Sequence, residues 1–189
     1  MSAATADLPV IVTPRTVMRV PSPDDAQLLL DYKNANRAHL APWEPARDAA
    51  YFTLAATRER IAMLREDCLA GRGVPFIAVA PDSGAIVATC NLSNIVRGVF
   101  QACHLGYSVA AARQGSGIMT EVAQAAIDHA FGTLGLHRVM ANYMPANERS
   151  ARLLEKLGFE REGYARAYLR IDGRWEDHVL TARINPRAD

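Results

Sequence analysis

The sequence has little of what marks several large protein classes. Its three cysteines, Cys68, Cys90 and Cys103, are odd in number and lack CxxC spacing, which argues against a disulfide framework and a zinc site. The 21 basic and 20 acidic side chains leave a net charge of only +1, so no basic excess exists for binding nucleic acid through bulk charge. We therefore expect reduced thiols, no metal and no DNA partner.

Long apolar runs are absent as well. No stretch reaches the roughly 20 apolar residues of a membrane span, and residues 1–9 lack the basic start and apolar run of a signal peptide. We expect a cytoplasmic protein without a membrane partner. With 189 residues and 50% hydrophobic side chains, the chain can bury one sizeable core. One domain over residues 1–189, with its core at about 10–184, is the expected organisation.

The first half of the chain predicts strands and helices in mixed order. A run rich in Val, Ile and Thr indicates a strand, and Pro14 near its start indicates an edge or a bulge there. A Ser-Pro-Asp-Asp sequence indicates a helix start. The turn Pro81-Asp82-Ser83-Gly84 lies between two apolar runs and predicts a hairpin. The expected elements are a strand over 10–20, a helix from Ser22 to the prolines at 42 and 45, a helix over about 49–69, and a hairpin of 76–80 and 85–89 followed by a loop around Arg97.

The second half reads as β-α-β followed by a hairpin. Apolar residues recur at helical spacing between Gly117 and Leu134, and we expect Gly135 to cap that helix. Asn147 and Gly158 are expected to bound a shorter helix, and Asp172-Gly173 predicts a tight hairpin turn. The expected strands are 104–109, 138–143, 159–170 and 175–184. These elements predict an α+β fold with a mixed sheet.

The stretch between Tyr107 and Met119 carries the clearest chemical signal. It reads as a strand, a glycine-containing loop and a helix start. Unpaired N–H groups at a helix N-terminus, together with the helix dipole, favour an anion such as a phosphate. The loop lacks the lysine of a Walker motif, and Thr120 stands where a dinucleotide fingerprint has its third glycine. A diphosphate-bearing cofactor other than these two classes is the hypothesis.

The loop also carries a family likeness. Gln114-Gly115-Ser116-Gly117, followed by Asn147-Glu148-Arg149-Ser150 and Leu157-Gly158-Phe159, resembles the GNAT superfamily of acyl-CoA N-acyltransferases. Met119 stands where the motif of that superfamily has a small residue. Residues 101–107, 140–145 and 168–178 are similar to bacterial ribosomal-protein-alanine N-acetyltransferases of the RimJ/RimL type, nearer to RimJ. The resemblance implies a splayed mixed sheet with helices on both faces, and it covers about 10–182.

The resemblance also implies how acetyl-CoA is held. The loop backbone would bind the pyrophosphate, the strand edge at Ser108 would pair with the pantetheine amides, and the Val109 N–H would polarise the thioester carbonyl. Asn147 would bond the pantetheine arm in addition to capping its helix. The cofactor-binding residues so implied are Ser108, Val109, Arg113, Gln114, Gly115, Ser116, Gly117, Ile118, Met119 and Asn147.

For catalysis, the resemblance implies that an amine attacks the thioester directly. Many GNAT enzymes use a tyrosine acid at the position of Leu154, so Ser150, one turn earlier, is the implied group that protonates or hydrogen-bonds the departing thiolate. An α-amine with a pKa near 8 needs only a modest base. Glu44 and His104 are the candidate bases, and Glu176 and Asp177 are weaker ones.

The acceptor implied is the N-terminal amine, most readily alanine, of a ribosomal protein, with association with the ribosome as a further expectation. Two alternatives stay open. One is acetylation of a small-molecule amine, such as a polyamine, an aminoglycoside or an amino acid. The other is a non-catalytic acyl-CoA-binding factor of the ribosome. An acidic pocket would favour a polyamine or an aminoglycoside, whereas a narrow neutral groove would favour a peptide. The arginines of the last hairpin are as compatible with a solvated face as with a partner.

Overall fold

The computed structural model describes residues 8–187, so most of the segment examined for a signal peptide, residues 1–9, lies outside it. Eight strands form one sheet in the order β1-β2-β3-β4-β5-β6-β8-β7. The strands are β1 (Val10–Val12), β2 (Val17–Arg19), β3 (Val74–Val79), β4 (Ile86–Val96), β5 (Ala102–Val109), β6 (Arg138–Tyr143), β7 (Glu160–Ile171) and β8 (Arg174–Ile184). The helices are α1 (Ala26–Ala35), α2 (Arg37–Leu40), α3 (Leu54–Leu69), α4 (Ile118–Gly132) and α5 (Glu148–Lys156).

The sheet is mixed, as the sequence predicts. All neighbouring strands are antiparallel except β5 and β6, which run parallel in its centre. Helix α4 connects these two strands, as a parallel crossover requires. The α+β fold class with a mixed sheet is confirmed.

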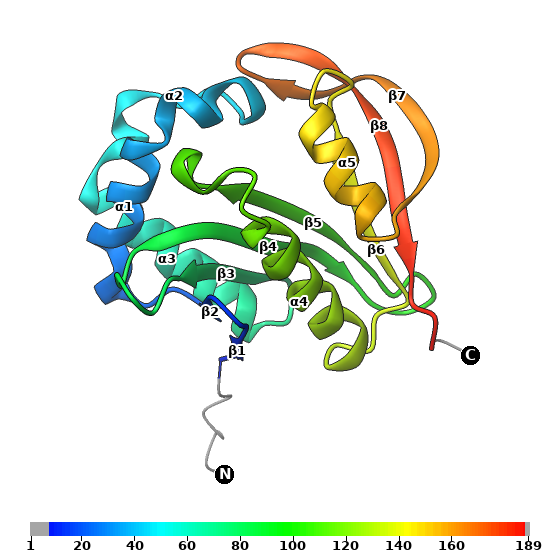
Figure 1. Ribbon diagram of the computed structural model, residues 1–189, viewed down its shortest axis with the longest axis horizontal. Coiled ribbons are helices and arrows are strands. Elements are labelled where there is room, and N and C mark those ends of the chain that lie inside the picture. Colours follow the sequence, from blue (N-terminus) through cyan, green and yellow to red (C-terminus); the bar gives the residue numbers. More distant parts are fainter. Residues whose placement is uncertain (1–7, 188–189) are drawn as a thin grey trace.

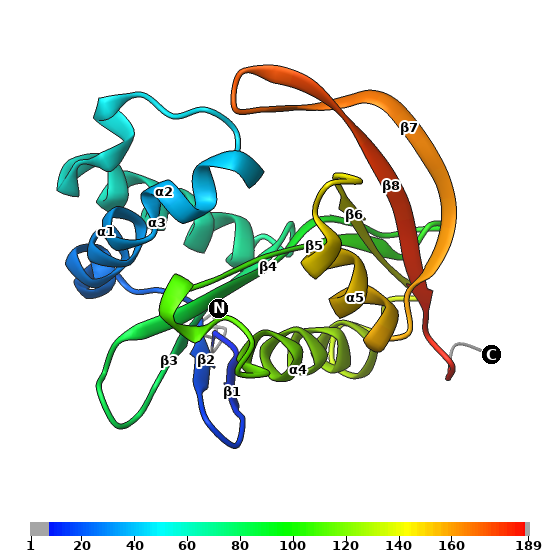
Figure 2. The same cartoon turned by 45° about the horizontal axis from the view of Figure 1, so that its top comes forward.

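Helices cover both faces of the sheet, and the alternation along β3 shows why. Val74, Phe76 and Ala78 pack in a core with α4 and α5, whereas Ile77 joins a second core with α1 and α3. Successive side chains of a strand point to opposite faces, so a strand with two apolar faces demands cover on each. Figures 1 and 2 show α1, α2 and α3 on one side of the sheet and α4 and α5 on the other.

The predicted strand over 10–20 is wrong as a single element. It is a hairpin, in which β1 and β2 pair antiparallel around residues 13–16. Thr13 donates its backbone N–H to the carbonyl oxygen of Thr16 (2.9 Å), and the two threonine hydroxyls lie 2.8 Å apart. Pro14 has no N–H to give a ladder, so the chain turns there. The expectation of an edge is confirmed, because β1 is the outermost strand.

Other boundaries differ from prediction as well, and the first expected helix is broken at Asn36 into α1 and α2. The helix expected from Ala49 is a short 3₁₀ turn over Ala49–Phe52, and α3 begins only after Thr53, whose hydroxyl accepts the N–H of Ala56. Strand β4 runs on to Val96, well beyond the predicted 85–89. Helix α4 ends at Gly132, with Thr133 as its C-cap, so Gly135 does not cap it.

The last elements agree closely with prediction. Asn147 caps α5, and Gly158 follows its end with a φ of +76°, the left-handed conformation that favours glycine. Strands β7 and β8 meet at the turn of Asp172 and Gly173, both with positive φ. This hairpin extends from the body of the sheet toward the segment around α2 (Figure 2).

A buried ion pair fixes the start of α1 against the sheet. Asp25 is 6% exposed and accepts hydrogen bonds from both terminal nitrogens of Arg19, at 2.5 and 2.6 Å, and from the backbone N–H of Ser22, at 2.6 Å. Burial alone would raise the pKa of Asp25, but the hydrogen bonds from Arg19 and Ser22 outweigh it and hold the pKa below its usual value.

We expect Asp25→Ala to lower the free energy of unfolding by about 2 kcal/mol at neutral pH, because Arg19 then loses a hydrogen-bonded charge partner. Since the pKa of Asp25 is lowered by folding, its stabilising effect is complete above the ordinary carboxyl pKa. It is lost as the pH falls through the lowered value. Urea unfolding at several pH values checks this, with exposed Asp24→Ala as the control. Equal losses in the two variants would contradict the account.

Candidate active site

The central parallel strands form a fork. β5 and β6 share three register positions, the last of which pairs His104 with Met140. Beyond that point the two strands diverge, β5 toward the start of α4 and β6 toward α5 (Figure 1). The splay that the resemblance implies is therefore present, and it begins two residues before Gly106.

The backbone of β5 directs unused hydrogen-bonding groups into this fork. Ala110 donates its N–H to Val87, at 2.9 Å, and so faces β4. Because alternate residues of a strand direct their N–H groups to opposite sides, Val109 and Tyr107 direct theirs toward β6. Among the residues that the structure describes, the register gives neither a partner on that side. The edge between them is open to pair with an extended ligand.

The glycine loop lies at the mouth of the fork. Gly117 is the N-cap of α4 with a φ of +80°, and Gly115 has a φ of +71°. No side chain caps the helix, so its first N–H groups stay available to an anion. Ile118 and Met119 are buried in the core, and they offer the site only their backbone. Residues 113–117 are exposed except Gln114, which is partly buried.

Side chains from three other elements hold this loop. Asn36 accepts the N–H of Ala111 at 2.8 Å, and the amide nitrogen of Gln114 lies 3.0 Å from Nε2 of His39. From the other side of the fork, Arg149 on α5 donates to the side-chain amide oxygen Oε1 of Gln114. Gln114 thus links α2 to α5 across the mouth of the fork.

Arg15, from the β1–β2 turn, sits at the N-terminus of α4. Its guanidinium donates to the Ser116 carbonyl oxygen at 2.7 Å and to Glu121 at 2.7 Å, and its backbone N–H donates to Glu121 at 2.9 Å. Burial raises the pKa of Glu121, but hydrogen bonds from Thr13 and Arg15 more than offset it and lower the pKa overall. Arg15 therefore ties the β1–β2 turn to the loop and to the first turn of α4, with its charge balanced by Glu121.

Ser150 lies in the first turn of α5, on the far arm of the fork. Its backbone N–H donates to the Asn147 side chain at 3.1 Å, which confirms Asn147 as the helix cap. Its hydroxyl lies 2.5 Å from the hydroxyl of Tyr107 on β5. Burial raises the pKa of Tyr107 to about 12, so its phenol is protonated at neutral pH. The pair joins the two arms of the fork.

The two candidate bases lie on the other face of β5. Ser108 points toward α1, where its hydroxyl lies 2.9 Å from that of Tyr32, and His104 shares that face by the two-residue alternation. Ser108 stands four positions after His104, about 13 Å along a strand. Glu44 pairs with Lys33 at 3.0 Å and raises the pKa of Tyr32 through its charge, so it lies near the Ser108 end.

His104 lies where the pairing of β5 with β6 ends. Its Nδ1 atom is buried, and no hydrogen-bond partner for it exists among the described residues. Burial lowers the pKa of His104, so its ring is neutral near pH 7. The structure brings neither His104 nor Glu44 into hydrogen-bond contact with Ser150.

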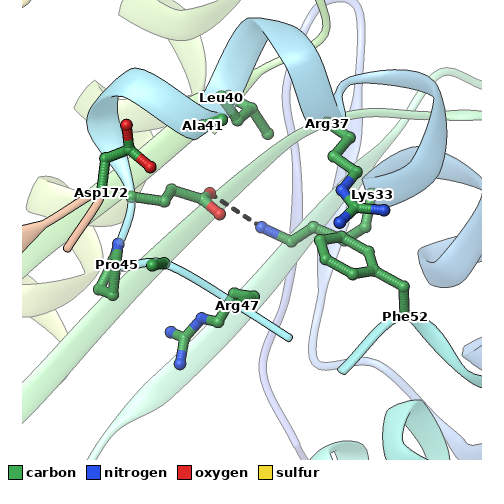
Figure 3. A pocket seen from close by; sticks show the side chains of 10 residues that line it. Lys33, Arg37, Leu40, Ala41, Pro45, Arg47, Phe52 and Asp172 are labelled. Carbon is green, nitrogen blue, oxygen red and sulfur yellow. Dashed lines mark hydrogen bonds and ion pairs between the residues drawn. The ribbon is translucent and has the colours of Figure 1, made fainter. Parts of the chain in front are cut away.

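A cavity of about 180 Å³ lies beside Glu44 (Figure 3). It opens between the segment of α1 and α2 and the tip of the last hairpin, where Asp172 donates its backbone N–H to the Glu44 carbonyl oxygen at 3.1 Å. Its charged lining residues are Lys33, Arg37, Arg47, Glu44 and Asp172. Bases outnumber acids, so the cavity is not the acidic pocket expected for a polyamine or an aminoglycoside.

Several site residues were not predicted from the sequence. The sequence pattern indicates Tyr107 only as an apolar position of an alternating strand. It places Arg15 within the expected strand over 10–20, not in a turn. Arg149 lies inside the Asn-Glu-Arg-Ser motif, which was the one signal that could have identified it. The hydrogen bonds of Asn36 and His39 join positions 75 residues apart, so no local sequence pattern indicates them.

Within residues 8–187, no three or more His, Cys, Asp and Glu side chains gather closely enough to ligate a metal. In the same part of the chain, no helix has the length and apolar character to span a membrane.

Comparison with known proteins agrees with this geometry. The family model described as an acetyltransferase (GNAT) domain matches residues 15–160. The [ribosomal protein uS5]-alanine N-acetyltransferase of Escherichia coli is 47% identical over 93% of this chain and 91% of its own length.

Two solved structures are similar over nearly the whole chain. The ribosomal-protein-S5-alanine acetyltransferase from Vibrio fischeri has a TM-score of 0.91 and 40% identity, covering 96% of this chain and 99% of that one. Mycobacterium smegmatis RimJ, in complex with CoA-disulfide, has a TM-score of 0.86 and 30% identity over 94% of this chain and 86% of its own. The fork, the glycine loop and these matches together place the chain in the GNAT acetyltransferase family.

Proposed function

We propose that this acetyltransferase moves the acetyl group of acetyl-CoA to the N-terminal amine of a ribosomal protein, with alanine as the first residue. The observation that carries the proposal is 47% identity over 93% of the chain to an enzyme named for that reaction. Ribosomal proteins are made and assembled in the cytoplasm, so we place the enzyme there and propose that it meets its substrate on or near the ribosome.

The residues at the fork suit acetyl-CoA as the donor. The uncapped start of α4 offers N–H groups to the pyrophosphate, and the guanidinium of Arg15 lies beside them. The open edge of β5 offers the N–H groups of Val109 and Tyr107 to an extended amide-bearing arm. Residues 113–119, Val109 and Asn147 remain the proposed cofactor-binding set, and Tyr107 joins it. The Ser108 N–H, two residues before that of Ala110, faces β4 by the same alternation, so Ser108 is not retained.

The acceptor and the leaving group are proposed to occupy opposite faces of β5. An amine that approaches from the side of α1 and the cavity meets the carbonyl carbon held at the edge of β5, where the Val109 N–H polarises the carbonyl oxygen. Ser150, on the side of α5, hydrogen-bonds the sulfur as the C–S bond breaks. The proton released by the attacking amine goes to a base on the acceptor side.

We propose Glu44 as that base, acting through a water molecule. Its charge acts on Tyr32, whose hydroxyl meets that of Ser108, the residue before Val109, whereas His104 lies about 13 Å further along the strand. Lys33 holds the Glu44 carboxylate at the cavity wall. His104 remains the second candidate, since its neutral ring also accepts a proton.

The test of the proposed reaction is acetyl transfer to a panel of short peptides that differ only in the first residue, with spermidine, an aminoglycoside and free alanine as competing acceptors. We expect turnover on alanine- and serine-starting peptides and a loss of about 100-fold in kcat for Ser150→Ala. Arg152→Ala, two residues further along α5 and exposed, is the matched control. Turnover confined to a small amine would overturn the acceptor, and acetyl-CoA binding without turnover would favour a non-catalytic factor.

The base is tested by Glu44→Gln beside His104→Gln. We expect Glu44→Gln to lower kcat at pH 7 by about 100-fold, with partial recovery at pH 9. There the free α-amine, whose pKa is near 8, is already deprotonated and needs no base. The loss in His104→Gln should be much smaller and show no such recovery. The opposite ranking in a pH–rate comparison would assign the base to His104.

A further inference from the structure

Among the residues that the structure describes, the hydroxyls of Tyr107 and Ser150 form the one side-chain hydrogen bond between β5 and α5. The oxygens lie 2.5 Å apart, the short end of the range for O–H···O contacts. Tyr107 lies on β5 and Ser150 at the start of α5, which follows β6, so the pair spans the fork. A thioester bound along the edge of β5 would therefore pass beside this pair.

Counting the available donors and acceptors decides which of the two hydroxyls donates. Each hydroxyl has one hydrogen to donate, and the Tyr107 oxygen has no second partner among the described residues. If Ser150 donated, the phenol hydrogen would be left in a largely buried site without an acceptor. If Tyr107 donates, its hydrogen is used and the Ser150 hydrogen is free to point into the fork.

The protonation of Tyr107 agrees with that direction. The pKa of Tyr107 is raised to about 12. Burial is the main cause, the charges that Cys90 and Tyr143 would carry if ionised contribute, and the hydrogen bond to Ser150 acts in the opposite direction. The phenol therefore keeps its hydrogen through the physiological pH range and stays a donor. A donor that polarises an intermediate hydroxyl strengthens the next hydrogen bond in the chain.

We propose that Tyr107 is a positioning residue for the leaving group: it donates to the Ser150 oxygen and so aims the serine hydrogen at the sulfur of CoA. This inference rests on the role of Ser150 in the proposed function. When the C–S bond breaks, its electron pair goes to sulfur, and the thiolate is stabilised by the Ser150 hydrogen. The amine proton leaves to the base, the thiolate takes a proton from water after release, and Tyr107 keeps its own.

Titration of the CoA thiol in its complex with the enzyme tests this without any acceptor. The ultraviolet absorbance of the thiolate reports its pKa, which is near 8.5 for an ordinary thiol. We expect a lowered pKa in the wild-type complex. In Tyr107→Phe it should rise by about one pH unit, the tenfold effect of one hydrogen bond to a charged group. The affinity for CoA at pH 7, where the thiol is protonated, should change by less than twofold.

A matched control is Tyr32 of α1, which packs against the opposite face of β5. Tyr32 is also buried, burial also raises its pKa to about 12, and its hydroxyl also meets a serine hydroxyl, that of Ser108 at 2.9 Å. Tyr32→Phe therefore removes the same group at a similar structural cost. We expect it to leave the pKa of the bound thiol at the wild-type value.

Kinetics supply the second measurement. Tyr107→Phe should lower kcat about tenfold with an unchanged KM for acetyl-CoA, and the double variant Tyr107→Phe/Ser150→Ala should be no slower than Ser150→Ala alone. A purely structural role would add the two losses and would lower the melting temperature in step with kcat.

The outcomes separate the two claims. A wild-type thiol pKa in Tyr107→Phe, with a raised one in Ser150→Ala, would overturn the role of Tyr107 and leave that of Ser150 intact. A wild-type thiol pKa in both variants would overturn the role of Ser150 in the proposed function, and the inference with it. The identity of the acceptor is decided separately by the peptide panel.

Discussion

The open edge of β5 in the middle of the sheet is the constraint on which the site depends. Central strands normally pair on both sides, because an N–H without a partner away from water costs free energy. Here the pairing of β5 with β6 ends at His104, and Tyr107 and Val109 are left facing the fork. A ligand with its own amide groups can complete the ladder. The fold thus carries a binding site because its sheet is incomplete at one place.

In the proposed mechanism, the fork also divides the chemistry between two faces. Side chains of β5 alternate, so Ser108 and His104 face α1 while Tyr107 faces α5. The cavity beside Glu44 opens on the first face, and Ser150 lies on the second. An acceptor and a leaving group on opposite sides of one carbonyl do not compete for space. Gln114 joins the glycine loop to α2 and α5, so in the proposed mechanism the loop would set the distance of both groups from the cofactor phosphates.

Local sequence signals predicted the elements that local chemistry decides. The Asn147 cap, the Gly158 stop and the Asp172-Gly173 turn each depend on residues within a few positions, and each was confirmed. The glycine loop at the start of α4 was predicted for the same reason. The strand over 10–20 was wrong because Val and Thr favour strands on either side of a turn, and only the threonine bonds at 13 and 16 show where the chain reverses.

Contacts between distant segments could not be predicted in this way. Arg15 meets Glu121 across 106 residues and Tyr107 meets Ser150 across 43, and neither pair leaves a periodic or motif signal in the chain. Family resemblance brought Ser150 to attention, but not the tyrosine that holds it. The ranking of Glu44 over His104 likewise needed the strand alternation and the position of the cavity.

Amide hydrogen exchange, measured residue by residue with and without CoA, tests the open edge of β5 most directly. The account predicts that CoA slows exchange at the Val109 and Tyr107 amides and at residues 115–119. The Ala110 amide, already bonded to Val87 on β4, should exchange slowly in both states and serves as the internal reference. Unchanged exchange at Val109 and Tyr107 in a complex saturated with CoA would contradict the account.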